Sequence, residues 1–142
     1  MTSGARQRVY LDTSAYLCLL LGQEGSERLG GLLDRAEILA SVLLVLESRR
    51  NLVRLARQGS ITSEQYQASV ARVEADTTRF VLRDLTLDLC ESNTVPAVAT
   101  PRSLDLVHLR TALWFHGAKP IDRFVTMDTS QQSAAKELGL PV

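Results

Sequence analysis

The chain has 142 residues, a length that fits one domain with its own hydrophobic core. Hydrophobic residues make up 45% of it and charged residues 23%, as in ordinary globular proteins, which argues against a disordered or fibrous chain. The formal net charge is zero, so overall basicity gives no reason to expect nucleic acid, although a neutral protein can still hold a locally basic groove.

The sequence carries no pattern typical of export or membrane insertion. Residues 1–8 are polar and lack the apolar core of a signal peptide, and no apolar run is long enough to span a bilayer. The two cysteines, Cys18 and Cys90, lie far apart in apolar helical patterns, which predicts buried, reduced thiols. No cysteine or histidine has the spacing of zinc ligands. The expected location is the cytoplasm, without membrane contact.

Short apolar stretches alternate with helical patterns in the first half of the chain. The predicted elements are, in chain order, a strand over 8–11, a helix over 13–21 ended by Gly22, a short helix over 26–35, a strand over 37–40, a helix from its cap Ser41 to Gln58, and a helix from Thr62 or Ser63 to Thr78.

The second half continues the alternation, with Pro96 and Pro101 expected to interrupt the chain. The predicted elements are a strand over 80–82, a helical turn over 87–93, a helix from Ser103 to Phe115 stopped by Gly117, a strand over 123–127, a helix over 129–138 followed by Gly139, and a last strand over 140–142. This order predicts a single α/β domain over residues 1–142, with a parallel sheet covered by helices on both faces.

Four carboxylates stand out, and three of them have an ordinary structural explanation. Asp12 and Asp128 each lie between a predicted strand and a predicted helix, where aspartate is a good N-cap. Asp105 falls in the first turn of its helix, where the helix dipole favours a negative charge. Glu47 lies beyond the first turn of its helix, so capping cannot explain it, and an ordinary solvent-facing glutamate is the alternative.

The predicted topology brings these four acids to one edge of the sheet. In an open parallel sheet, ligands bind outside the carboxyl ends of the strands. Asp12 follows the first strand and Asp128 follows the fourth, whereas Asp105 begins a helix. Glu47 lies in the helix that leaves the second strand. We therefore expect all four side chains to converge on one cleft.

Carboxylates packed that closely repel one another and raise each other's pKa, and a divalent cation removes the conflict. Oxygen ligands without histidine or cysteine favour Mg²⁺ or Mn²⁺ over zinc. Such a site suits phosphodiester hydrolysis, because a bound ion activates water and offsets charge on the leaving oxygen. Thr13, Ser14 and Thr126 carry hydroxyls at the same strand ends. They are expected either to position water or a phosphate oxygen, or to serve only as turn and cap residues.

The motifs around these acids resemble those of the PIN-domain ribonucleases, specifically the VapC toxins of VapBC toxin–antitoxin pairs. The matching motifs, in chain order, are VYLDTSAYL with Asp12, SVLLVLESRR with Glu47, RSLDLVHLRTAL with Asp105 and FVTMDTS with Asp128. Their order and spacing agree with the family from about Val9 to the closing AAKELGLPV. Arg110 and Gln132 depart from the usual residue types, and Arg110 either alters local packing or faces the substrate.

The resemblance implies a PIN-like three-layer α/β/α domain around a short, mainly parallel central sheet. It also implies an endoribonuclease that depends on Mg²⁺ or Mn²⁺, hydrolyses RNA and acts as the toxin of a type II toxin–antitoxin pair. Asp12, Asp105, Asp128 and Glu47 are then the catalytic and metal-binding residues, with Asp12 and Asp105 as direct ligands. A small cognate antitoxin and a second copy of the chain, as a homodimer, are the implied partners.

Two other functions are weighed against this one. A non-catalytic PIN-like module that binds RNA or a partner shares the fold, but the presence of all four acids argues against it. A phosphoacceptor receiver domain normally needs paired acids after its first strand and a late lysine. Asp12 has no acidic neighbour, and Lys119 precedes the fourth strand. His108, one turn after Asp105, either neighbours the metal site or RNA, or is a surface or packed histidine; the second explanation is favoured, and no role is assigned to it.

Overall fold

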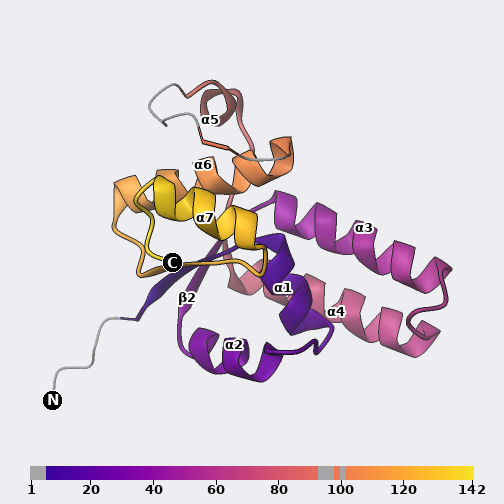
Figure 1. Cartoon of the computed structure of the whole chain (residues 1–142). Coiled ribbons are helices and arrows are strands. Elements are labelled where there is room, and N and C mark those ends of the chain that lie inside the picture. Colours follow the sequence, from indigo (N-terminus) through magenta and orange to yellow (C-terminus); the bar gives the residue numbers. More distant parts are fainter. Residues whose placement is uncertain (1–5, 93–97, 100–101) are drawn as a thin grey trace, which may run out of the picture.

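The computed structural model describes residues 6–92, 98–99 and 102–142 (Figure 1). Four strands form one sheet in the order β3-β2-β1-β4, and every described pair of neighbouring strands is parallel. The strands are β1 (Arg8–Leu11), β2 (Glu37–Ser41), β3 (Val81–Arg83) and β4 (Arg123–Val125). Tyr10 of β1 pairs with Leu39 of β2 on one side and with Phe124 of β4 on the other.

Helices cover both faces of this sheet, which confirms the predicted three-layer α/β/α architecture (Figure 1). The helices are α1 (Thr13–Leu20), α2 (Ser26–Leu33), α3 (Leu43–Arg57), α4 (Ser63–Arg79), α5 (Leu87–Glu91), α6 (Ser103–Ala118) and α7 (Thr129–Glu137). Helices α1 to α4 pack on one face, and α6 and α7 pack on the other.

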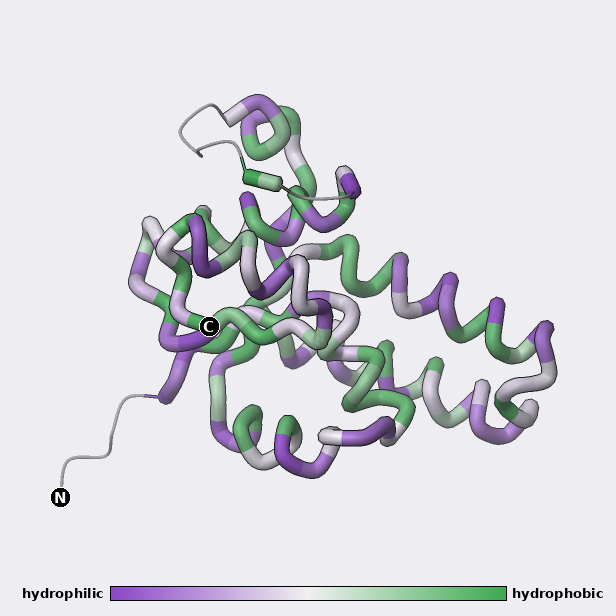
Figure 2. Tube along the Cα trace, in the orientation of Figure 1, coloured by the Kyte–Doolittle hydropathy of each residue, from purple (hydrophilic) through white to green (hydrophobic). Residues whose placement is uncertain are grey.

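The alternation of side chains along β1 explains the two hydrophobic cores. Val9 and Leu11 point into the core under α1 to α4, and Tyr10 points into the core under α6 and α7. All three side chains are fully buried. The helices are amphipathic as well. Figure 2 shows hydrophobic and hydrophilic residues alternating along α3 and α4. No helix among the described residues is long and apolar enough to cross a membrane.

Most predicted elements are present, and the differences in their ends have local causes. Helix α6 does not stop at Gly117 but continues to Ala118. It ends where Pro120 forces the preceding Lys119 into an extended conformation. Ser41 ends β2 instead of beginning the next helix, because it pairs with Arg83 of β3. Its hydroxyl still accepts the backbone N–H of Leu43.

Two further predictions are wrong. Residues 140–142 do not form a strand: Phe124 donates one backbone hydrogen bond to Pro141, but proline has no N–H with which to continue a ladder. Cys18 is buried as expected, whereas Cys90 is exposed, because the short helix α5 buries Leu89 instead. Pro96 and Pro101, predicted to interrupt the chain, lie outside the described residues.

The strand order creates the crevice in which the acids lie. The chain leaves β1 toward β2 on one side, and β4 lies on the other side of β1, so the direction of winding changes between β1 and β4. Connections on the two sides then diverge at the carboxyl ends of these strands, and such switch points are where open α/β sheets bind ligands. Asp12 follows β1 and Asp128 lies shortly after β4, so the two flank this crevice.

Candidate active site

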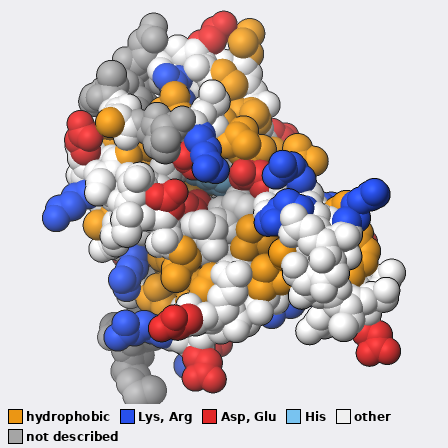
Figure 3. Space-filling view, turned by 45° about the vertical axis from the view of Figure 1, so that its right-hand side comes forward, with side chains coloured by type: hydrophobic (Ala, Val, Ile, Leu, Met, Phe, Trp, Pro, Cys, Tyr) orange, Lys and Arg blue, Asp and Glu red, His pale blue; other side chains and the backbone are white. Residues whose placement is uncertain are grey.

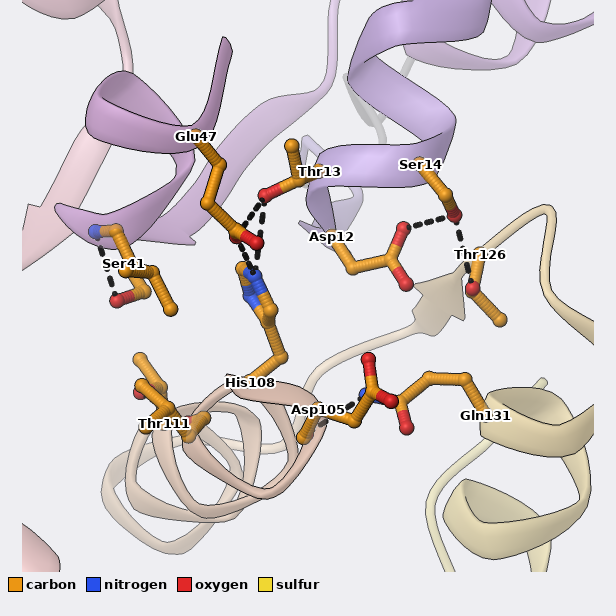
Figure 4. A network of polar contacts seen from close by, with 12 residues as sticks. Asp12, Thr13, Ser14, Ser41, Glu47, Asp105, His108, Thr111, Thr126 and Gln131 are labelled. Atoms are coloured by element: carbon orange, nitrogen blue, oxygen red, sulfur yellow. Dashed lines mark hydrogen bonds and ion pairs between the residues drawn. The ribbon is translucent and has the colours of Figure 1, made fainter. Parts of the chain in front are cut away.

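Asp12 is the first residue after β1 and the N-cap of α1. Its Oδ1 atom accepts the backbone N–H of Ala15 at 3.1 Å and the hydroxyl of Ser14 at 2.7 Å. The residue is only 5% exposed. Both bonds use the same oxygen, and Figure 4 shows the other oxygen of the carboxyl group pointing toward Asp105. Asp12 can therefore cap its helix and still present an oxygen to the crevice.

Asp128 caps the other helix at this edge. Its Oδ1 atom accepts the backbone N–H groups of Ser130 at 2.8 Å and Gln131 at 3.2 Å at the start of α7. Helix α7 is tied in turn to α6, because the side-chain amide of Gln131 donates to the backbone oxygen of Asp105 at 2.8 Å. Asp128 is exposed, so it lies at the mouth of the crevice.

Asp105 lies in the first turn of α6, between the two capping acids. Burial raises the pKa of its carboxyl group, and the negative charge of Asp128, followed by the weaker effect of Asp12, raises the pKa further. The positive charge of Arg102 lowers the pKa in part. Three carboxyl groups from three different elements thus act on one another electrostatically, as expected if they share one site.

Glu47 of α3 is held by a separate set of hydrogen bonds (Figure 4). Its Oε1 atom accepts the hydroxyl of Thr13 at 2.6 Å and lies 3.0 Å from Nε2 of His108. Burial alone would raise the pKa of Glu47, but the bonds from His108 and Thr13 outweigh it and hold the pKa below its ordinary value. Glu47 is therefore kept ionised and fixed beside Asp12, rather than pointing freely into solvent.

His108 contacts both Tyr10 of β1 and Glu47 of α3. The ring is 3% exposed; its Nδ1 atom lies 2.9 Å from the hydroxyl of Tyr10, and its Nε2 atom also lies 3.1 Å from the hydroxyl of Thr13. An ionised carboxylate only accepts hydrogen bonds, so the contact with Glu47 requires the proton on Nε2. The sequence-based expectation of a packed histidine is correct, and the structure connects this histidine with Glu47, a connection to which the sequence assigned no role. In the sequence, its position one turn after Asp105 is the feature that indicates a place near the site.

The three predicted hydroxyls occupy different places in the site. Thr13 binds Glu47, as described above. The hydroxyl of Ser14, besides bonding to Asp12, lies 3.1 Å from that of Thr126 and accepts the backbone N–H of Met127 at 2.9 Å. These contacts join the end of β1 to the segment after β4. All three hydroxyls therefore have structural partners, and their predicted contact with water or substrate stays a prediction.

The donor set of the crevice agrees with the chemistry expected for a hard cation. The groups that gather there are carboxylates and hydroxyls, which Mg²⁺ and Mn²⁺ prefer. Burial first, and then the charges of Asp128 and Asp12, raise the pKa of Asp105, and a cation would offset the part due to these acidic neighbours. In the described part of the chain, no three His, Cys, Asp or Glu side chains are yet close enough to hold a metal ion together. A bound ion would therefore have to draw the acids closer.

Arg110 does not face this site. Its guanidinium donates to the backbone oxygens of Leu89 at 3.3 Å and Cys90 at 2.8 Å, so it fastens α5 to α6. Of the two explanations left open by the sequence, local packing is the correct one. Gln132, the other departure from the family pattern, is exposed on α7, whereas its neighbour Gln131 is the buried residue that contacts α6.

Comparison with known proteins places the chain in a family. It is 31% identical over 139 residues to Ribonuclease VapC35 of Mycobacterium tuberculosis, in the strains CDC 1551 and H37Rv, and the match covers 94% of both chains. No protein-family model matches the sequence. The chain belongs to the VapC family of PIN-domain ribonucleases, as its motifs predicted.

A solved structure supports the fold independently. The crystal structure of VapC20 from Mycobacterium tuberculosis, a toxin that cleaves the sarcin–ricin loop, matches with a TM-score of 0.55. The match covers 89% of this chain and 94% of that one, with 15% sequence identity. At this identity the likeness shows the shared fold alone.

The raised pKa of Asp105 predicts a pH-dependent effect of Asp105→Asn on stability. A folded-state pKa above the unfolded value means that the folded protein loses stability as pH rises through that pKa. In EDTA at neutral pH, the variant should therefore be at least as stable as the wild type. As pH falls below about 4, the wild-type carboxyl group is protonated in both the folded and the unfolded state. The stability of the variant relative to the wild type should therefore be lower there than at neutral pH.

Urea denaturation at the two pH values measures this difference. Asp34→Asn is the matched control, because Asp34 is an exposed carboxylate that precedes β2 at the opposite edge of the sheet. A variant that loses stability by the same amount at both pH values would show that the pKa of Asp105 is not raised in the folded protein.

Proposed function

We propose that this chain is a Mg²⁺- or Mn²⁺-dependent endoribonuclease that hydrolyses RNA phosphodiester bonds as the toxin of a type II toxin–antitoxin pair. The observation that carries the proposal is the convergence of Asp12, Asp105 and Asp128 at the switch point of the sheet, in a chain of the VapC ribonuclease family. When bound, the cation supplies positive charge that offsets the charge of the phosphate and makes water more acidic.

The residues of the chain divide this task between them. Asp12 and Asp105 are proposed as direct ligands, because their carboxyl groups face each other in the crevice (Figure 4). Asp128 completes the negative charge at the mouth. Glu47 is held ionised to one side, so in our proposal it accepts a hydrogen bond from water on the ion or binds a second ion. Thr126 and Ser14 keep the ends of β4 and β1 in register.

His108 is proposed as a positioning residue for Glu47. Its Nε2–H group aims at Oε1 of Glu47, while Tyr10 fixes the other side of the ring. Without the imidazole, Glu47 would keep only the bond from Thr13 and could turn toward solvent. The role is therefore to set the direction of a carboxylate, not to contact RNA.

The partners of the family lead to a cellular proposal. VapC toxins pair with small antitoxins, so we propose that a cognate antitoxin covers the acidic crevice of this chain. We also propose that the active unit is a homodimer in the cytoplasm. The exposed position of Asp128 at the mouth of the crevice supports access by both a strand of RNA and an inhibitory protein segment.

The Asp12→Asn variant tests the metal mechanism. Asparagine caps a helix about as well as aspartate, so a residue that only caps would tolerate the change. A metal ligand would not, because the site loses a full negative charge while its shape is kept. RNA cleavage should fall by orders of magnitude, the thermal shift caused by Mn²⁺ should shrink, and stability in EDTA should stay the same or rise.

The wild type provides the control for that experiment, since EDTA should abolish its cleavage of RNA. Full activity of wild type in EDTA, or full activity and an unchanged Mn²⁺ shift in the variant, would overturn the metal mechanism. A protein that binds Mn²⁺ and RNA but never cleaves would instead favour the non-catalytic alternative.

A double-mutant cycle tests the role of His108. His108→Ala should lower kcat more than it raises KM, because Glu47 loses its orientation rather than its contact with substrate. If His108 acts through Glu47, then Glu47→Ala combined with His108→Ala should cost no more activity than Glu47→Ala alone. A merely structural histidine would lower the melting temperature and give additive losses of activity. Additive losses in kcat would contradict the positioning role.

Expression in a bacterial host tests the toxin role. The chain alone should arrest growth, because an unrestrained ribonuclease depletes functional RNA, and co-expression of its genomic neighbour should relieve the arrest. The Asp12→Asn variant is the matched control and should not arrest growth. Normal growth with folded, RNA-cleaving protein in the cell would count against the toxin role but not against the ribonuclease.

A further inference from the structure

A groove lies next to the acidic crevice and has no part in the function described so far. It encloses a volume of about 620 Å³ between α2 and the segment that leads out of β4. This volume lies within the range of roughly 300–1,000 Å³ typical of ligand sites. Its floor is apolar and is formed by Leu29 and Leu32 of α2 together with Val125 and Met127. Met127 is 51% exposed, so part of this floor is open to solvent.

Two arginines line the groove beside this apolar floor. Arg28 comes from α2 and Arg123 from β4, and both are exposed. Within residues 6–92, 98–99 and 102–142, neither guanidinium makes a hydrogen bond or an ion pair. Arg8 of β1, by contrast, bonds to Glu37. The groove therefore offers two guanidinium groups without a bonded partner among the described residues, next to an apolar surface.

The groove adjoins the acidic crevice at Thr126. This residue lines the groove, and its hydroxyl lies 3.1 Å from that of Ser14, which in turn donates to Asp12 at 2.7 Å. A chain molecule that lies in the groove can thus reach the acids by passing one pair of hydroxyls. Figure 3 shows acidic side chains around the histidine in the middle of the molecule, with hydrophobic and basic side chains around them.

The charges favour RNA as the occupant. The acids of the crevice repel a phosphate backbone, and the chain as a whole has no net positive charge to attract one. An RNA strand therefore needs cationic contacts close to the acids, and guanidinium groups supply such contacts to phosphates. An apolar surface beside these contacts can pack against the face of a base. Contacts of this kind hold a single strand with little regard to its sequence, because every base has such a face.

We propose that this groove binds one nucleotide of a single-stranded RNA segment adjacent to the cleaved bond. Its base lies on the floor around Met127, and its phosphates contact Arg28 and Arg123. The inference rests on the proposed ribonuclease function, but it concerns binding of the strand and not the chemistry at the acids.

Charge removal in the groove is the first test. The probe is a short fluorescent oligoadenylate, titrated in EDTA so that binding is measured without cleavage. Arg28→Ala combined with Arg123→Ala should raise Kd about tenfold and reduce the slope of log K against log salt by about 1.4, at about 0.7 per lost phosphate contact on a single strand. Lys136→Ala, which removes an exposed positive charge from the far part of α7, should leave Kd and slope nearly unchanged.

Removal of the apolar floor is the second test and does not depend on charge. Met127→Ala should raise Kd for oligoadenylate several-fold but leave Kd for an abasic ribose-phosphate oligomer of the same length unchanged. In cleavage assays with Mn²⁺, all groove variants should raise KM and leave kcat unchanged, because the groove contacts the strand away from the acids. Melting curves of each variant confirm folding, which exposed side chains of this kind should not disturb.

The outcomes separate this proposal from the proposed function. Wild-type protein that binds oligoadenylate through the arginines but does not cleave RNA would support the groove and count against the ribonuclease. Wild-type protein that does not bind oligoadenylate, or binds as well after removal of both arginines, would overturn the groove. Groove variants that convert a dimer to a monomer would show that a second copy of the chain occupies this surface, and would also overturn the proposal.

Discussion

The hydrogen bonds of Asp12 are the interaction on which both the fold and the site depend. One oxygen of its carboxyl group accepts the backbone N–H of Ala15 in the first turn of α1 and the hydroxyl of Ser14, so the turn from strand to helix closes around a negative charge. Helix N-termini favour a negative charge, which helps to keep a carboxylate with 5% exposure in place. Asp128 repeats this arrangement at the start of α7. Two helix caps thus place two acids on either side of one crevice.

The acids experience opposite environments within a short distance. Glu47 receives hydrogen bonds from Thr13 and His108, which favour its ionised form despite partial burial. Burial and the negative charges of Asp128 and Asp12 raise the pKa of Asp105, so its ionised form is disfavoured. A proton or a cation can neutralise the unfavourable negative charge of Asp105, whereas hydrogen bonds already stabilise the negative charge of Glu47. The charge of Glu47 is therefore balanced by hydrogen bonds within the protein, whereas the charge of Asp105 is not, as expected where acids are kept together for a cation.

The sequence revealed the parts of this site that leave a local signal. Asp12 and Asp128 could be located because an aspartate between an apolar run and a helical pattern is typical of a cap. His108 could not be linked to Glu47 and Tyr10, since 61 and 98 residues separate it from them and only the fold brings them together. A prediction from one residue was also wrong where a nearby residue had a larger effect on the backbone.

The end of helix α6 is an example, because it is set by Pro120 and not by Gly117. Gly117 weakens a helix by about 1 kcal/mol but does not end it, whereas Pro120 excludes the helical conformation of the residue before it. Arg110 could not be placed for a related reason: its partners are backbone oxygens of α5, which no side-chain pattern reports. The catalytic and metal-binding roles of the four acids stay predictions, because geometry and charge support them without testing them.

The stretch from Tyr10 to Ser14 is linked to several other parts of the site by hydrogen bonds and by charge. Tyr10 reaches the ring of His108 in α6, and Thr13 reaches Glu47 in α3. Ser14 reaches Thr126 beyond β4, while the charge of Asp12 acts on Asp105. Within β1 itself, Tyr10 points toward α6 and α7 and Leu11 points toward α1 to α4, so the strand meets both helical layers. The central strand therefore sets the positions of both helical layers relative to the crevice, and a shift of β1 by one residue would separate all of these pairs at once.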